Sequence, residues 1–144
     1  MIIVALDLGS RTCGVAKSDL SQSLAFGVRT LRFNEGDYEA AITLATAVCE
    51  EIQAGMVIIG YPLLLNGDRG PQALLAERFA EVLREEVSIP VELWDERFTT
   101  VMAQKTLIAT DASRRKRRKV VDTVAAEYIL QSYLDAKRKE TNGN

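Results

Sequence analysis

A short apolar run that ends in an acidic residue places the tightest constraint on the fold of this chain. Residues 2–6 are Ile-Ile-Val-Ala-Leu without a polar interruption, as expected of a strand that is buried on both faces. Asp7 follows this run directly. Gly9 and Gly14 then predict a tight turn and a second strand, over residues 15–18, that returns beside the first. Asp7 would therefore stand at an edge of the sheet, where it could either contact a ligand or cap the turn.

The rest of the chain predicts an α/β fold, with a mixed sheet flanked by helices. Further strands are predicted at residues 24–33, 56–60 and 91–94, and helices at residues 38–53, 71–86, 100–109 and 120–137. This order favours parallel pairing of the first, fourth and fifth strands, which we expect at the centre of the sheet. The chain contains no internal repeat and no linker. We therefore expect one domain over residues 1–138 and a flexible tail over residues 139–144.

The composition limits the chemistry that is available. The 144 residues include no histidine and two cysteines, which excludes histidine-dependent triads, histidine-ligated metals and a disulfide scaffold. No apolar run approaches the roughly 20 residues that span a bilayer. The amino terminus also lacks the pattern of a secretory signal. We therefore expect a cytoplasmic protein with reduced cysteines and no membrane partner.

Charge is distributed unevenly along the chain. The net charge is −2, but residues 1–113 carry nine basic against sixteen acidic residues, and residues 114–144 carry nine against four. Six consecutive cations form a basic run: Arg114, Arg115, Lys116, Arg117, Arg118 and Lys119. Such a run is usually a solvated segment. Alternatively, it binds the phosphates of a nucleic acid without reading the sequence, and Arg11, Lys17 and Arg97 could add contacts near the same edge.

Two strands that we expect to be parallel end in acidic residues. The first strand ends at Asp7, and the fifth ends at Asp95 and Glu96. Ligands bind at the carboxyl ends of the strands in such sheets, so these acids should meet at one edge. Alternation along the fifth strand places Asp95 and Glu96 on opposite faces, and at a strand end either residue could reach the site.

A further acid, Asp122, opens the last predicted helix. It belongs to an apolar stripe that should face the sheet and that contains Ala125, Ala126, Ile129 and Tyr133. Capping of the helix would explain Asp122 equally well. Together, the acids would form a cluster of like charges that requires cations, and carboxylates suit Mg²⁺ or Mn²⁺. Two such ions are the usual apparatus for attack of water on a phosphodiester.

Four segments of the chain match one known family in order and spacing. They are Asp7-Leu-Gly-Ser with Gly14-Val-Ala-Lys-Ser-Asp19, Gly60-Tyr-Pro62 with Asn66-Gly67, Asp95-Glu-Arg-Phe-Thr-Thr100, and Asp122-Thr-Val-Ala-Ala-Glu-Tyr-Ile-Leu-Gln131. Through these segments, nearly the whole chain resembles the YqgF/RuvX family of the RNase H-like superfamily. Members of this family are described as pre-16S rRNA nucleases or Holliday junction resolvases.

The resemblance implies an RNase H-like mixed five-stranded sheet whose second strand is antiparallel. It also implies a two-metal-ion nuclease with catalytic residues Asp7, Asp95, Glu96 and Asp122, in which Asp7, Asp122 and one residue of the Asp95–Glu96 pair bind Mg²⁺ or Mn²⁺. Many RNase H-like nucleases have an acid at the end of strand four, where this chain has Gly60, so that ligand must come from strand five. The expected reaction is hydrolysis of phosphodiester bonds during 5′-end processing of pre-16S rRNA in ribosome biogenesis. The alternative substrate is a four-way DNA junction, and the protein would act as a monomer or a homodimer.

Two other classes of function stay open. The opening Asp-x-Gly-Ser pattern also occurs in the nucleotide-binding half of sugar kinases and actin-like ATPases, although those proteins need two such halves. Binding or turnover of ATP would favour that class. A non-catalytic RNA-binding factor for ribosome assembly would instead bind RNA without a divalent metal and without Asp7.

Overall fold

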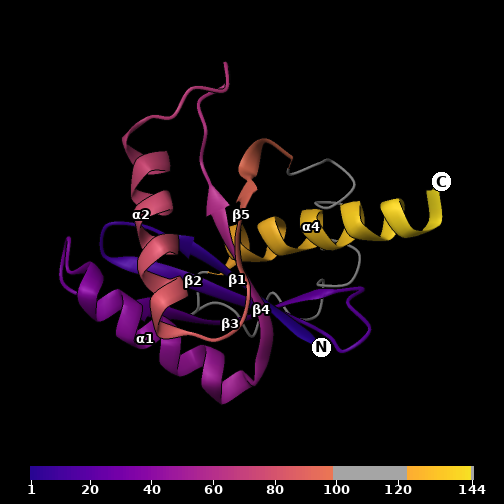
Figure 1. Ribbon diagram of the computed structural model, residues 1–144, viewed down its shortest axis with the longest axis horizontal. Helices are drawn as coiled ribbons and strands as arrows, with labels where there is room; N and C mark the ends of the chain where they lie inside the picture. The colour runs from indigo at the N-terminus through magenta and orange to yellow at the C-terminus, as the bar shows by residue number, and fades with distance from the viewer. Residues whose placement is uncertain (99–122, 144) are drawn as a thin grey trace.

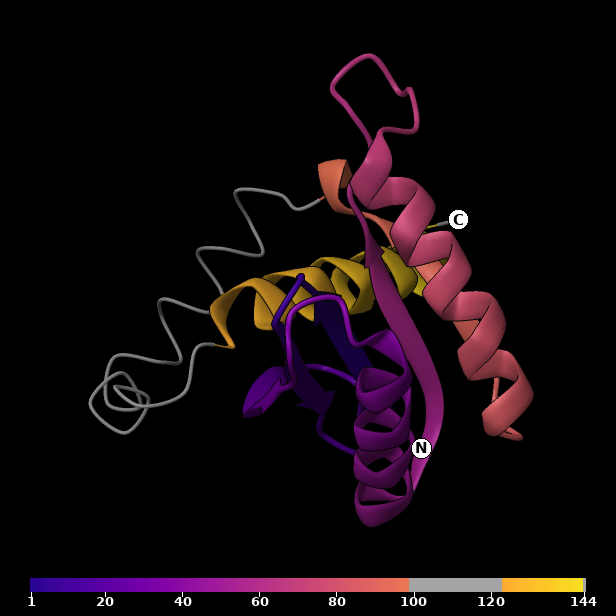
Figure 2. The same ribbon diagram turned by 90° about the vertical axis from the view of Figure 1, so that its left-hand side faces the viewer.

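The computed structural model describes residues 1–98 and 123–143, which form a single sheet with helices on both faces (Figures 1 and 2). The strands are β1 (Ile2–Leu8), β2 (Thr12–Ser18), β3 (Ala25–Arg32), β4 (Ala54–Tyr61) and β5 (Val91–Asp95). The helices are α1 (Tyr38–Ile52), α2 (Pro71–Glu86) and α4 (Val124–Gly143), and a 3₁₀ helix, η1 (Glu96–Phe98), follows β5.

The order of strands in the sheet is β3-β2-β1-β4-β5. β2 is antiparallel to β1 and to β3, whereas β1, β4 and β5 are parallel to one another. The mixed five-stranded α/β sheet with an antiparallel second strand is thus confirmed. The expectation that β5 is central was wrong, because β4 separates β5 from β1 and β5 is the last strand of the sheet among the described residues.

Alternation along β1 divides the core into two layers. Val4 and Leu6 pack on the face that α1 and α2 cover, whereas Ile3 and Ala5 pack on the face that α4 covers. All four side chains are buried, which explains the uninterrupted apolar sequence of β1. The two cysteines of the chain are free and buried.

Helix α4 is rotated and extended relative to the sequence prediction. Ala125 is exposed, so its predicted place on the sheet was wrong. The buried apolar residues of α4 are Ala126, Ile129, Leu130, Tyr133 and Leu134. The helix also continues beyond residue 137 to Gly143, and the ion pairs Arg138–Asp135 and Lys137–Glu140 lie along this end.

Polar anchors on β3 explain the rotation of α4. The backbone N–H groups of Ala25 and Gly27 donate to the side chains of Gln131 (2.9 Å) and Glu127 (3.1 Å). A Cβ atom at Gly27 would lie 2.1 Å from the hydroxyl of Thr123, so only glycine permits this close approach. These contacts bind the start of α4 to β3 and satisfy donors of an edge strand.

Several sequence predictions concern residues outside the described ranges. They are the helix at residues 100–109, the basic run at residues 114–119 and the position of Asp122. The division into a domain over residues 1–138 and a tail also stays a prediction. Among the described helices, none has the length and apolar character needed to cross a membrane.

Candidate functional site

Asp7 lies at the carboxyl end of β1, as the apolar run predicts. It pairs with Gly14 of β2 and shares the alternation of Ile3 and Ala5, which places it on the sheet face that α4 covers. Asp7 is half-buried, whereas residues 3–6 before it are buried. The carboxylate therefore lies where the hydrophobic core meets solvent, at the carboxyl ends of the parallel strands.

Glu96 brings a second carboxylate to the same face. A Cβ atom built on Gly60, near the end of β4, would lie 2.7 Å from Oε2 of Glu96 and 2.7 Å from Cδ1 of Ile129. The side chain of Glu96 thus crosses the end of β4 and uses the space that Gly60 leaves open. Strand four supplies no acid of its own, but the absence of a side chain there admits the acid that follows strand five.

The charge of Asp7 acts on the carboxylate of Glu96. Burial, together with the negative charges of Asp7 and Asp95, raises the pKa of Glu96 to about 7. The structure therefore holds Asp7 and Glu96 as a pair of mutually repelling carboxylates. We refer to these two residues below as the acid pair.

Asp95 has a different environment. The side chain of Arg97 forms an ion pair with it at 2.8 Å, and the backbone N–H of Arg97 donates to the same carboxylate at 2.9 Å. These hydrogen bonds hold the pKa of Asp95 below its usual value. The guanidinium of Arg97 also donates to the carbonyl oxygen of Leu65 at 3.3 Å, so it joins Asp95 to the loop after β4.

The chemistry of the acid pair fits a divalent cation, because a nearby positive charge would offset the repulsion that raises the pKa of Glu96. Within residues 1–98 and 123–143, no group of three or more acidic, cysteine or histidine residues could hold a metal ion. The acid pair can thus provide part of a ligand set. Asp122, the remaining predicted ligand, lies outside these ranges.

Two of the predicted phosphate-binding residues, Arg11 and Lys17, lie at different distances from the carboxyl end of β1. Arg11 is exposed in the turn between β1 and β2, at the same edge as Asp7, and forms an ion pair with Glu35 at 3.3 Å. Lys17 pairs with Val4, farther from that edge, and follows the alternation of the β2 residues that face α1 and α2. Of these two cations, the structure brings Arg11 to the edge of the acid pair.

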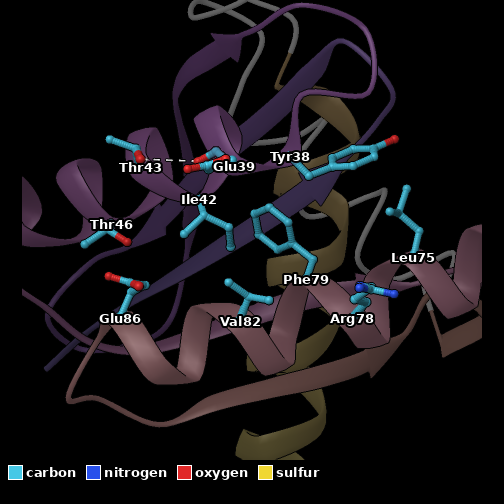
Figure 3. A pocket seen from close by; sticks show the side chains of 10 residues that line it. All are labelled: Tyr38, Glu39, Ile42, Thr43, Thr46, Leu75, Arg78, Phe79, Val82 and Glu86. Carbon is cyan, nitrogen blue, oxygen red and sulfur yellow. Dashed lines mark hydrogen bonds between the residues drawn. The ribbon is translucent and has the colours of Figure 1, made fainter.

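A separate groove lies between α1 and α2, on the other face of the sheet from α4. It has a volume of about 480 Å³, and Ile42, Phe79 and Val82 line its floor (Figure 3). The polar side chains of Arg78 and Glu86 stand at its rim. Neither member of the acid pair lines this groove, so the two features are independent.

Two solved structures share the fold of this protein. RuvC from Thermus thermophilus, in a complex with a Holliday junction substrate, superimposes with a TM-score of 0.65 at 12% identity, over 98% of this chain and 97% of that chain. The Holliday junction resolvase of fowlpox virus superimposes with a TM-score of 0.60 at 12% identity, over 94% and 99% of the two chains. At such low identity the likeness shows the fold alone, which is the RNase H-like fold of RuvC.

Sequence comparison then identifies the family. A family model described as "RuvX: Holliday junction resolvase" matches residues 1–136. A relative from Geobacillus kaustophilus is 48% identical over 140 residues, which cover 96% of this chain and 100% of the relative. A relative from Bacillus subtilis is 42% identical over 136 residues, or 94% and 99% of the two chains, and both bear the name of a pre-16S rRNA nuclease. The chain belongs to the RuvX (YqgF) family, and the resemblance found in its sequence is confirmed.

Proposed function

We propose that this protein is a metal-dependent nuclease that hydrolyses phosphodiester bonds of pre-16S rRNA, in 5′-end processing in the cytoplasm. The observation that carries the proposal is the acid pair: Gly60 lets the carboxylate of Glu96 reach the charge of Asp7 at one edge of the sheet. The names of the relatives support the nuclease activity and the rRNA substrate.

Asp7, Glu96 and Asp122 would hold the divalent cations, Mg²⁺ or Mn²⁺, in a two-ion site. When bound, such ions activate water and stabilise the charge that develops on the phosphate during in-line attack. Asp7 and Glu96 contribute negative charge and oxygen donors from fixed positions, and the chain provides no histidine for either task. Because the pKa of Glu96 is about 7 without a cation, this side chain must lose a proton near neutral pH in order to act as a ligand.

We assign Glu96, in preference to Asp95, as the ligand from strand five. The carboxylate of Asp95 accepts hydrogen bonds from both the backbone and the guanidinium of Arg97, so its oxygens are engaged. Asp95 is then a positioning residue that orients Arg97. Arg11 and the basic run, with Arg97 and Lys17 as further candidates, would contact the phosphates of the nucleic acid.

A four-way DNA junction is the second candidate substrate, because the matching family model is described as a Holliday junction resolvase. An enzyme that cuts two strands symmetrically would act as a homodimer, whereas a nuclease that cuts one strand could act as a monomer. The oligomeric state in solution therefore helps to separate the two substrates.

A cleavage assay tests the proposal directly. The purified protein is incubated with a structured precursor of the 16S rRNA 5′ end and with a four-way DNA junction, each with Mg²⁺, with Mn²⁺ or with EDTA. We expect metal-dependent cleavage of the RNA. Preferred cleavage of the junction would select the resolvase alternative, and metal-independent RNA binding without any cleavage would indicate an assembly factor. Turnover of ATP in a parallel assay would favour a phosphotransferase.

A further inference from the structure

The β4–α2 loop, residues 62–70, carries two exposed leucines near the acid pair. Leu65 is 95% exposed and Leu64 is 52% exposed. The loop projects beyond the sheet in both views, at the end where β4 stops and η1 begins (Figures 1 and 2). Single exposed apolar residues are common on protein surfaces, so exposure alone means little. The hydrogen bonds and ion pairs that hold this loop in place, and its position beside η1, indicate that the two leucines contact a ligand.

Backbone hydrogen bonds define the tip of the loop. The N–H of Gly67 donates to the carbonyl of Leu64 at 2.8 Å, and the N–H of Leu64 donates to the carbonyl of Asp68 at 2.9 Å. Asn66 accepts from the N–H of Asp68 at 2.9 Å. Gly67 has a φ of +91°, a conformation that glycine adopts far more readily than other residues. The tip is therefore a closed turn that presents Leu65 to solvent.

The two ends of the loop are bound to α2. Glu77 accepts a hydrogen bond from the hydroxyl of Tyr61, at the start of the loop, and forms an ion pair at 3.1 Å with Arg69, near its end. One glutamate thus joins both ends of the loop to the same helix. The loop projects as a braced element whose direction is set by its base.

Arg97 connects the tip to the site. It follows Glu96 in η1, forms an ion pair with Asp95 and donates to the carbonyl oxygen of Leu65. A single guanidinium thus joins the exposed leucine to Asp95, the residue that precedes Glu96 in the sequence. The tip of the loop therefore lies against the segment that carries Glu96, on the path of nucleic acid that approaches this segment.

We propose that Leu65, with support from Leu64, inserts between two bases of the substrate beside the scissile phosphodiester. This inference rests on the proposed nuclease function and deepens it, because it assigns the element that recognises the shape of the substrate. Apolar side chains inserted into a base step unstack it and bend the helix. Two leucines offer far less surface than the roughly 800 Å² that each partner buries in a stable protein interface. A single leucine is enough to insert between two bases. The wedge selects nucleic acid that unstacks at low cost, at a bulge, a junction or the end of a helix.

The test compares Leu65→Ser and the double variant Leu64→Ser/Leu65→Ser with the wild-type protein. The matched control is Leu20→Ser, since Leu20 is 74% exposed but follows β2 at the opposite end of the sheet from Asp7. The probes are a bulged RNA hairpin and a four-way DNA junction with the fluorescent base 2-aminopurine at the bulge or the branch point. Binding is measured with Ca²⁺ in place of Mg²⁺, and cleavage is measured with Mg²⁺.

We expect the wild type and Leu20→Ser to increase the fluorescence of 2-aminopurine on binding, because an unstacked base is less quenched. Leu65→Ser should abolish this increase and weaken binding about tenfold, the effect of losing one well-buried leucine contact. All variants should unfold at the wild-type temperature, because the substituted leucines are exposed. The double variant should slow cleavage of both probes more than it slows cleavage of an unstructured strand, which has no base step to unstack.

Three outcomes would contradict parts of this account, and they can be told apart. Unchanged affinity, fluorescence and cleavage in the double variant would overturn the wedge and leave the nuclease function standing. Dissociation of a dimer by the leucine substitutions, with unchanged fluorescence, would show that the loop contacts a second copy of the chain and would also overturn the wedge. Absence of binding and cleavage by the wild type would contradict the nuclease function itself.

Discussion

The carboxylate of Glu96 occupies the space next to Gly60 that a side chain on strand four would fill. A Cβ atom on Gly60 would lie 2.7 Å from Oε2 of Glu96, closer than such atoms approach in proteins. The missing side chain and the position of the acid are therefore one feature of the site. Strand four contributes space, and the residue after strand five contributes the charge.

Gly60→Ala should displace both Glu96 and Ile129. We expect it to lower the free energy of unfolding by about 1–3 kcal/mol, as an added methyl group does in a well-packed site, and to reduce cleavage. The double variant Gly60→Ala/Ile129→Val removes the clash with Cδ1 of Ile129 but keeps the clash with Glu96. It should regain part of the stability in urea unfolding without regaining cleavage. Recovery of both quantities would show that only packing on α4 matters at Gly60.

The raised pKa of Glu96 predicts a specific dependence of stability on pH in the metal-free protein. The unfolded chain loses this proton near pH 4.5 and the folded chain near pH 7, so the folded state binds more protons between these values. Its stability relative to Glu96→Gln should therefore be greatest below pH 4.5 and fall as the pH rises to 7. We expect a total change of about 1–3 kcal/mol, allowing for partial exposure to solvent.

Urea unfolding in EDTA at several pH values measures this difference. Glu85→Gln is the control, because Glu85 is an exposed residue of α2 outside the acid pair. A difference between the wild type and Glu96→Gln that stays constant from pH 4 to pH 8 would show that neither burial nor the charge of Asp7 raises the pKa of Glu96 in solution.

Ala126 and Ala125 are neighbours on α4 with opposite environments. Ala126 is buried against the sheet and Ala125 is exposed. Ala126→Leu should overpack the contact and lower the free energy of unfolding by about 1–3 kcal/mol, whereas Ala125→Leu should change it by less than about 0.5 kcal/mol. Equal effects of the two substitutions, measured by urea unfolding, would mean that α4 is rotated differently in solution.

The basic run at residues 114–119 should supply affinity for nucleic acid that does not depend on sequence. Replacing all six cations with serine should weaken binding. If every cation contacts a phosphate, the slope of log affinity against log salt concentration should decrease in magnitude by about four to five. A variant with six lysines keeps the charge and should retain the wild-type slope. An unchanged slope in the serine variant would identify the run as a solvated segment.

Local patterns in the sequence predict the strands and most helices of this protein well. The apolar runs in β1 and β4 have few alternative structures, because burial on both faces is encoded by consecutive residues. The rotation of α4 was missed because it depends on hydrogen bonds from β3 to Glu127 and Gln131, about 100 residues away in sequence. The edge position of β5 likewise depends on pairing between distant segments.

Contacts that the local sequence does not encode also determine the arrangement of the candidate site. The sequence places Asp7 at a strand end and offers Asp95 and Glu96 as equal candidates, because alternation is lost where a strand passes into another element. The structure distinguishes them through η1, which directs Glu96 across Gly60 and pairs Asp95 with Arg97. The glycine in place of an acid at the end of strand four was the available signal for this arrangement.

The most direct test of the account compares the wild type with Asp7→Asn, in cleavage and in unfolding. The substitution keeps the size of the side chain but removes one charge of the acid pair. We expect Mg²⁺-dependent cleavage to be abolished, while stability in EDTA is equal or higher because the repulsion with Glu96 is relieved. Retained metal-dependent cleavage in Asp7→Asn, or a clear loss of stability in EDTA as expected of a purely structural turn residue, would contradict this expectation.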